Sequence, residues 1–141
     1  MSQATPKPVA LSVAGFDPSG GAGVLADLKT FFAHDCYGVA AVACLTAQNT
    51  REIGRVEPVH PELLRSQIQM LLEDIAIAGI KIGLVGSKKN LEVIAESLTA
   101  YSHLPIVADP VLRSSSGTDL FPDRDLGAFR QIGRASCRER V

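Results

Sequence analysis

The sequence contains no tryptophan and few other aromatic residues, with two Tyr and five Phe among 141 residues. Any core must therefore be built from aliphatic and alanine side chains, in line with the hydrophobic content of 46%. The three cysteines, Cys36, Cys44 and Cys137, form no Cys-x-x-Cys pair, which argues against a disulfide framework or a zinc site. We expect Cys36 and Cys44 to be small core residues.

The sequence also has no excess of positive or negative charge and no long apolar run. The formal net charge is −1, so the composition gives no reason to expect nucleic acid or an anionic membrane as a partner. No apolar stretch approaches the roughly 20 residues that span a bilayer. Residues 1–8 lack the apolar segment of a signal peptide, so we expect a cytoplasmic protein with a single domain.

Only the end of the chain departs from this ordinary composition. Residues 130–141 contain four arginines, and Glu139 is the one acidic residue among them. This stretch has neither the apolar face of a helix nor the alternation of a strand. We therefore divide the chain into a folded portion, residues 1–129, and a non-native or disordered basic tail, residues 130–141. The alternative is a genuine basic tail.

Apolar runs alternate with amphipathic stretches along most of the chain. Such alternation predicts an α/β sheet that is mostly parallel and covered by helices on both faces. The pattern predicts strands at 9–14, 37–45, 53–59, 78–85 and 105–112, and helices at 22–34, 61–75 and 90–101, the last with Asn90 as its N-cap.

Polar stretches follow four of these strands, at residues 15–23, 46–50, 83–87 and 109–117. All four are rich in Gly, Asp, Asn, Gln, Ser or Thr. In parallel sheets of this class, ligands bind beyond the carboxyl ends of the strands. We therefore expect the four stretches to form one site.

The first stretch, AGFDPSGGAG at residues 14–23, surrounds Asp17 with four glycines. Gly15 and Gly20 have the spacing of a P-loop, but Gly21 stands where that motif requires lysine, and the dinucleotide fingerprint is absent as well. What remains is a glycine-rich turn that leads into a helix N-terminus with free N–H groups. The alternative is a tight turn without function.

Four segments now carry a resemblance to a known family. GFDPSGGAGVLADLKTF, LTAQNT, KIGLVGS and DPVL occur in this order between residues 15 and 112. In order and spacing they resemble the hydroxymethylpyrimidine/phosphomethylpyrimidine kinases, thiamine-pathway enzymes of the ribokinase-like superfamily. The resemblance covers residues 9–129. Pyridoxal kinases share the fold and the Asp-Pro-Val element, whereas the AQNT segment favours the pyrimidine enzymes.

The resemblance implies a three-layer α/β/α ribokinase-like fold with a mostly parallel sheet. It also implies two phosphoryl transfers that use ATP and Mg²⁺. The first phosphorylates 4-amino-5-hydroxymethyl-2-methylpyrimidine, and the second phosphorylates its monophosphate, in thiamine diphosphate biosynthesis. The expected partners are thus ATP and a small pyrimidine, and the family allows a homodimer of the full-length protein.

The resemblance assigns substrate-binding roles to residues at the strand ends. Gln48 matches the glutamine that reads the pyrimidine, and an amide supplies both the acceptor and the donors that an aminopyrimidine requires. Gly15 and Gly20 let the backbone approach a flat ring closely. Asp17 either orients the substrate or caps the helix that follows. The alternative for Gln48 is a solvated loop residue.

Three further residues complete the predicted site. Leu84 and Val111 match family positions that line the ring pocket, and ordinary core packing is the alternative for both. Asp109 is the predicted Mg²⁺ ligand, because Mg²⁺ binds oxygen and needs only one or two protein carboxylates beside nucleotide phosphates. Its alternative role is to initiate a turn before Pro110.

The chain departs from the family in one large respect. Family members continue with an ATP-binding region and a Gly-Thr-Gly-Cys motif, whose backbone donors form the anion hole for phosphoryl transfer. This sequence contains no Gly-Thr-Gly, so no catalytic residue is assigned. We expect a kinase portion that stops before the ATP and anion-hole region and is inactive by itself. A non-catalytic pyrimidine-binding module is the alternative, and a pyridoxal-kinase-like enzyme is a weaker one.

Overall fold

The computed structural model describes residues 6–109, which form one sheet with helices on both sides. The strands are β1 (Val9–Phe16), β2 (Tyr37–Gln48), β3 (Ile53–Pro58), β4 (Ile77–Ile82) and β5 (Ile106–Ala108). The helices are α1 (Gly23–Ala33), α2 (Pro61–Asp74) and α3 (Lys88–Leu98), and α3 is followed by the 3-10 turn η1 (Thr99–Tyr101).

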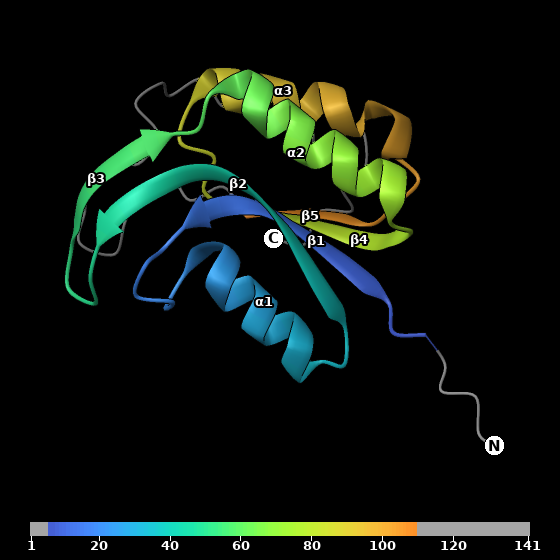
Figure 1. Ribbon diagram of the computed structural model, residues 1–141, viewed down its shortest axis with the longest axis horizontal. Helices are drawn as coiled ribbons and strands as arrows, with labels where there is room; N and C mark the ends of the chain where they lie inside the picture. Colours follow the sequence, from blue (N-terminus) through green and yellow to red (C-terminus); the bar gives the residue numbers. More distant parts are fainter. Residues whose placement is uncertain (1–5, 110–141) are drawn as a thin grey trace.

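The strands lie in the order β3-β2-β1-β4-β5. Every neighbouring pair is parallel except β2 and β3, which are antiparallel. Helix α1 covers one face of the sheet, while α2 and α3 lie side by side on the other (Figure 1). The predicted mostly parallel, three-layer arrangement is therefore confirmed.

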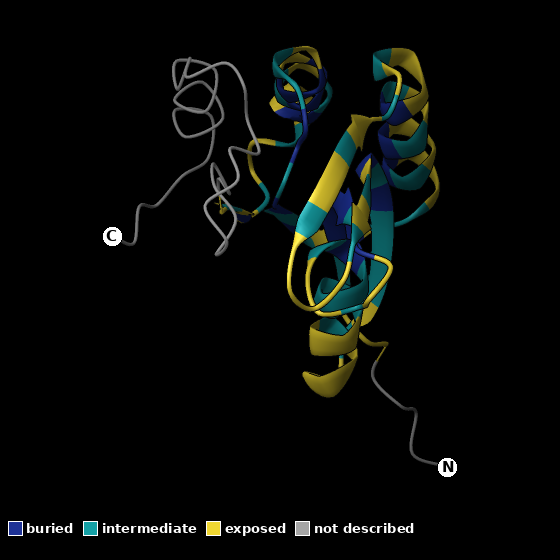
Figure 2. Ribbon diagram, turned by 90° about the vertical axis from the view of Figure 1, so that its left-hand side faces the viewer, coloured by how far each residue is buried: buried dark blue, intermediate teal, exposed yellow. Residues whose placement is uncertain are grey.

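The core is aliphatic, as the scarcity of aromatic residues predicts. Among residues 6–109, the buried hydrophobic side chains are Leu, Ile, Val, Ala and one Cys. They lie between the sheet and its helices, where Figure 2 shows the buried residues in dark blue. Helix α2 illustrates the pattern, because Leu64, Ile68 and Leu72 recur every four residues and form its buried face. None of the helices in the described range is long and apolar enough to cross a membrane.

Helix α3 begins earlier than the sequence predicts. Its N-cap is Ser87, whose Oγ accepts a hydrogen bond from the backbone N–H of Asn90 at 3.2 Å. Asn90 is fully buried, and its Nδ2 donates to the carbonyl oxygens of Ala43 (2.9 Å) and Val59 (3.0 Å). The prediction of Asn90 as the cap was therefore wrong, because its amide joins α3 to β2 and to the end of β3.

Strand β2 bends where it contains one extra residue. Ala14 lies opposite Val42, whereas Gly15 lies opposite Cys44, so one residue of β2 has no partner in β1. Gln67 of α2 stabilises this point, since its Oε1 accepts from the Val42 N–H at 2.9 Å and its Nε2 donates to the Val42 carbonyl at 3.2 Å. An extra residue increases the local bend and twist of a strand. The end of β2, which carries Gln48, follows this bend.

The connections from β1 and β4 leave the sheet in opposite directions. The chain passes from β1 to α1 on one face and from β4 to α3 on the other (Figure 1). Since β1 and β4 are parallel neighbours, their carboxyl ends flank a point where the connections diverge. Ligands of open α/β sheets bind at such points, which locates the candidate site.

Candidate active site

Three of the predicted polar stretches meet at the carboxyl edge of the sheet, and the fourth begins there. The Gly83 N–H donates to the Val13 carbonyl at 3.0 Å, and the Asp109 N–H donates to the Ile82 carbonyl at 2.8 Å. Thr46 Oγ1 donates to the Phe16 carbonyl at 3.0 Å, which ties the end of β2 to the end of β1. Residues 110–117 lie outside the described residues.

Gly15 and Leu84 are adjacent at this edge. A Cβ on Gly15 would lie 2.8 Å from Cys44 Sγ and 3.3 Å from Leu84 Cδ2. A Cβ on Gly86 would likewise lie 2.8 Å from the Cβ of Cys44. Cys44 therefore fits between two glycines, and burial raises the pKa of its thiol to about 11. The prediction that Cys44 packs in the core is confirmed, whereas Cys36 is only half-buried.

The Asp17 carboxylate organises the turn between β1 and α1. Its side chain lies within the turn, and the residue is 3% exposed. Oδ1 accepts from the backbone N–H and the hydroxyl of Ser19, both at 2.7 Å. Oδ2 accepts from the N–H groups of Gly21 (3.1 Å) and Ala22 (2.8 Å). Four donors therefore converge on one carboxylate.

These hydrogen bonds keep Asp17 ionised. Burial acts to raise the pKa of the carboxyl, but the bonds from Ser19, Ala22 and Gly21 outweigh it and hold the pKa below its usual value. Ala22 is the N-cap residue of α1 and has no cap from its own side chain. Of the two roles predicted for Asp17, the capping role is thus seen in its contacts, and substrate orientation stays a prediction.

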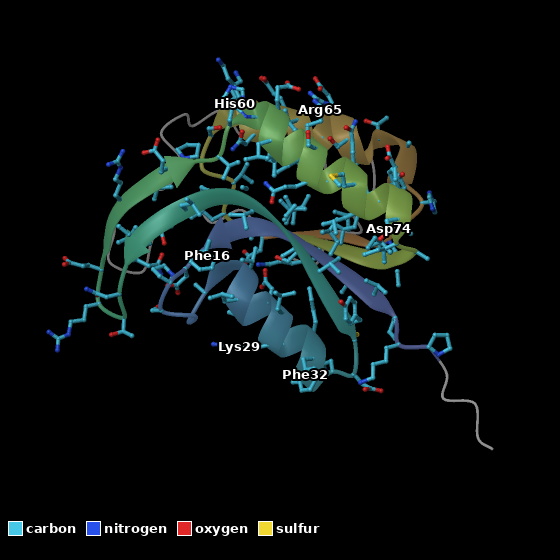
Figure 3. All side chains as sticks on the ribbon, in the orientation of Figure 1. Phe16, Lys29, Phe32, His60, Arg65 and Asp74 are labelled. Carbon is cyan, nitrogen blue, oxygen red and sulfur yellow. The ribbon has the colours of Figure 1, made fainter. Side chains whose placement is uncertain are left out.

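The glycines of this turn are required by its backbone. Gly20 and Gly23 adopt positive φ angles of 69° and 59°, which side-chain-bearing residues rarely adopt. A Cβ on Gly23 would also overlap the carbonyl oxygen of Gly15. Lys29 of α1, labelled in Figure 3, donates from Nζ to the Gly20 carbonyl at 2.8 Å. Gly20 therefore has a structural role in addition to the predicted substrate contact.

Gln48 ends β2 and is half-buried. Its Oε1 lies 2.8 Å from Thr46 Oγ1. The next residue, Asn49, is used by the turn itself, because its Oδ1 accepts from the N–H groups of Arg51 (2.8 Å) and Glu52 (3.1 Å). Within the AQNT segment, the asparagine thus builds the turn, while the glutamine pairs with Ile53 of β3 through its backbone and contacts Thr46 through its side chain.

Asp109 follows β5 and is exposed at the carboxyl edge. Between residues 6 and 109, no group of three or more His, Cys, Asp or Glu side chains could hold a metal ion. A single exposed carboxylate nevertheless fits Mg²⁺ that is bound mainly by phosphates and water. Val111, the other residue predicted on this segment, lies outside the described residues.

Two polar features of the site region were missed by sequence reasoning. Ser12 Oγ donates to Asp27 Oδ2 at 2.6 Å, and Lys81 Nζ contacts both oxygens of Asp27 at 3.0 and 2.9 Å, which joins β1, α1 and β4. The sequence does carry a signal for this contact, because β1 and β4 are apolar strands that each contain one polar residue, Ser12 and Lys81. Thr46 lies within the predicted stretch 46–50 but was given no role of its own, although it comes two residues before Gln48 and is therefore on the same face of β2.

Comparisons with known proteins agree with this architecture. A family model described as phosphomethylpyrimidine kinase matches residues 17–135. The hydroxymethylpyrimidine/phosphomethylpyrimidine kinase of Aquifex aeolicus is 44% identical over 115 residues, which are 82% of this chain and 45% of that protein. The chain thus spans about half the length of the curated relatives it matches.

Solved structures give the same result. The crystal structure of phosphomethylpyrimidine kinase from Clostridium difficile 630 has a TM-score of 0.78 and 39% identity, covering 87% of this chain and 53% of that one. An ADP complex of Bacillus subtilis pyridoxal kinase has a TM-score of 0.76 and 27% identity, covering 93% of this chain and 48% of that one. The expected ribokinase-like fold is therefore confirmed, and the chain belongs to the phosphomethylpyrimidine kinase family.

Proposed function

We propose that the full-length protein transfers phosphate from ATP to the hydroxymethyl group of 4-amino-5-hydroxymethyl-2-methylpyrimidine, and then to the resulting monophosphate, in thiamine diphosphate biosynthesis. The observation that carries this proposal is the position of Gly15, Gln48 and Leu84 at the carboxyl ends of three strands. They come from the ends of β1, β2 and β4, which are neighbours in the sheet.

The chemistry of these three residues suits a flat, polar-edged ring. Gly15 is proposed to contact the ring through its backbone, with Cys44 and Leu84 packed where its side chain would lie. Leu84 lies beside Gly15 and supplies an apolar surface. The Gln48 amide offers an acceptor and a donor side by side, which match the exocyclic amine and the adjacent ring nitrogen of an aminopyrimidine. Val111 is proposed as a second apolar contact to the ring.

The Asp17 turn is better suited to shaping the pocket than to holding phosphate. The N–H groups of Gly21 and Ala22 are occupied by the Asp17 carboxylate, and a second anion there would be repelled. The donors that stabilise the transferring phosphate must therefore come from other residues. This agrees with the lack of a Gly-Thr-Gly motif in the sequence, and the 141-residue polypeptide alone is expected to show no phosphoryl transfer.

Asp109 is the residue proposed to hold Mg²⁺, and the phosphates of ATP would supply further oxygen ligands. When bound, Mg²⁺ would neutralise charge on the phosphates of the nucleotide. Nucleotide use is supported by the ADP complex of the Bacillus subtilis pyridoxal kinase, whose fold this chain shares. We also propose a cytoplasmic location and, on the strength of the family resemblance, a homodimer of the full-length protein.

Pyridoxal is the second candidate substrate, because the pyridoxal kinase shares the fold at 27% identity. Identity to the pyrimidine kinases is higher, at 44% and 39%. The test is a kinase assay on the full-length protein with ATP and Mg²⁺, in which the pyrimidine and pyridoxal are compared by kcat/KM. We expect the pyrimidine to be the better substrate.

Gln48→Ala tests the role of the site in the same assay. Losing a hydrogen bond and leaving its partner unsatisfied costs about 1–3 kcal/mol, so kcat/KM for the pyrimidine should fall by about 5- to 150-fold. Gln69→Ala is the matched control, since Gln69 is exposed on α2. Preference for pyridoxal, or equal kcat/KM in both variants, would contradict the proposal.

A further inference from the structure

The Thr46 hydroxyl lies between two oxygen atoms at the end of β2. Its Oγ1 is 3.0 Å from the Phe16 carbonyl oxygen and 2.8 Å from Gln48 Oε1. Thr46 is half-buried, and Phe16 directly precedes the Asp17 turn. One hydroxyl therefore contacts both the backbone of β1 and the amide that we propose reads the substrate.

A hydroxyl group has a single proton, so Thr46 cannot donate to both oxygens at once. The Phe16 carbonyl can only accept, and the proton therefore goes to that oxygen. Thr46 Oγ1 is then an acceptor toward Gln48. The two ends of an amide have nearly the same shape, so turning the Gln48 amide by 180° brings its NH₂ group to Thr46. In that arrangement the Thr46 hydroxyl donates to the Phe16 carbonyl and accepts from the Gln48 NH₂ group, so each of the three groups has a hydrogen-bond partner.

We propose that Thr46 is a positioning residue that fixes which end of the Gln48 amide is donor and which is acceptor, and thereby selects a 4-aminopyrimidine over its 4-oxo analogue. The inference rests on the proposed function. With one N–H of Gln48 held by Thr46, the amide presents its oxygen and its other N–H in one fixed order. Without Thr46, the amide can present them in either order.

The two pyrimidines differ in the pattern that this order must match. In the 4-amino ring, the exocyclic amine donates and the adjacent ring nitrogen accepts. In the 4-oxo ring, the exocyclic oxygen accepts and the adjacent ring N–H donates. The hydroxymethyl group must point toward the phosphate donor, so the ring cannot turn over to restore the match. A fixed amide therefore rejects the 4-oxo ring by leaving polar groups unpaired.

The test compares the affinities of the full-length protein for the two rings by isothermal titration calorimetry. The ligands are 4-amino-5-hydroxymethyl-2-methylpyrimidine and its 4-oxo analogue. Thr46→Val keeps the branched shape and removes the hydroxyl, and we expect it to lower the ratio of the two affinities by about tenfold or more. Thr46→Ser keeps the hydroxyl and should retain the ratio. Thr30→Val is the control, because Thr30 lies exposed on α1 and its hydroxyl donates to the Ala26 carbonyl of the same helix.

Thr46→Ala is measured in parallel, so that a comparison with Thr46→Ser remains if the valine variant does not fold. An unchanged ratio in the variants without the hydroxyl, with weaker binding in Gln48→Ala, would overturn this inference and leave the proposed function standing. Unchanged pyrimidine binding in Gln48→Ala would overturn both. A lowered ratio in the Thr46 variants, restored by serine, would support it.

Discussion

Removing the Asp17 carboxylate should destabilise the turn that links β1 to α1. The carboxylate accepts four hydrogen bonds, three from backbone N–H groups and one from the Ser19 hydroxyl. In Asp17→Ala all four donors lose their acceptor. Hydrogen bonds to a charged group each contribute about 1.5–3 kcal/mol, so their sum sets an upper limit for the loss of stability.

The expected loss is smaller than this sum. Ser19, Gly21 and Ala22 are exposed, so water can replace the carboxylate at their N–H groups in the variant. We therefore expect Asp17→Ala to lower the free energy of unfolding by about 2–4 kcal/mol. Asp17→Asn keeps one acceptor oxygen but places NH₂ against N–H donors, and about 1–3 kcal/mol should be lost.

The pH dependence has a definite sign. The folded-state pKa of Asp17 is lowered from its ordinary value of 3.8, so the unfolded state takes up a proton more readily. The stabilisation is therefore complete above the unfolded pKa and is lost as the pH falls through the folded pKa. The difference between wild type and Asp17→Asn should be constant near neutral pH and shrink below about pH 4.

Urea denaturation of the full-length protein measures both effects. Asp35→Asn is the matched control, because the Asp35 side chain is 83% exposed and its ion pair with Lys7 lies at the surface. Asn also tolerates the positive φ of 58° at this position. The control should change stability by less than about 0.5 kcal/mol. If Asp17→Ala changes stability as little as this control, the carboxylate does not organise the turn.

Two further predictions concern the metal and the packing of the site. Asp109→Asn should raise the Mg²⁺ concentration needed for half-maximal turnover without weakening pyrimidine binding by calorimetry, and an unchanged Mg²⁺ dependence would remove Asp109 from the metal site. Gly15→Ala should destabilise the protein by about 1–3 kcal/mol, because its Cβ would lie 2.8 Å from Cys44 Sγ. Thermal denaturation should show partial recovery when Cys44→Ala removes that sulfur, and a lack of recovery would refute the steric explanation.

The sequence predicted the order and type of the elements better than their ends. Apolar runs identify β1, β2 and β4 because these strands are covered on both faces. The continuation of β1 to Phe16 and of β2 to Gln48 depends on pairing with residues distant in the chain, such as Phe16 with Leu45 and Gln48 with Ile53. No local pattern encodes such partners. The polar ends of strands were therefore read as loops.

The same limit applies to single side chains at the site. The position of Gly15, Gln48 and Leu84 at the ends of their strands was predictable from the apolar runs that precede them, while their contacts with a substrate stay predictions. The identity of the residue that caps α3 was not predictable. Ser87 and Asn90 are both residue types that cap helices, and the choice between them is made by Ala43 and Val59, which lie 47 and 31 residues from Asn90.

The central claim is that the carboxyl edge of this sheet binds the pyrimidine ring. A crystal structure of the full-length protein with 4-amino-5-hydroxymethyl-2-methylpyrimidine tests it most directly. We expect the ring to lie against the backbone of Gly15 and the side chain of Leu84, with its amine and adjacent nitrogen at about 2.7–3.2 Å from the Gln48 amide. A ring bound elsewhere, or a Gln48 amide that makes no contact with it, would contradict the account.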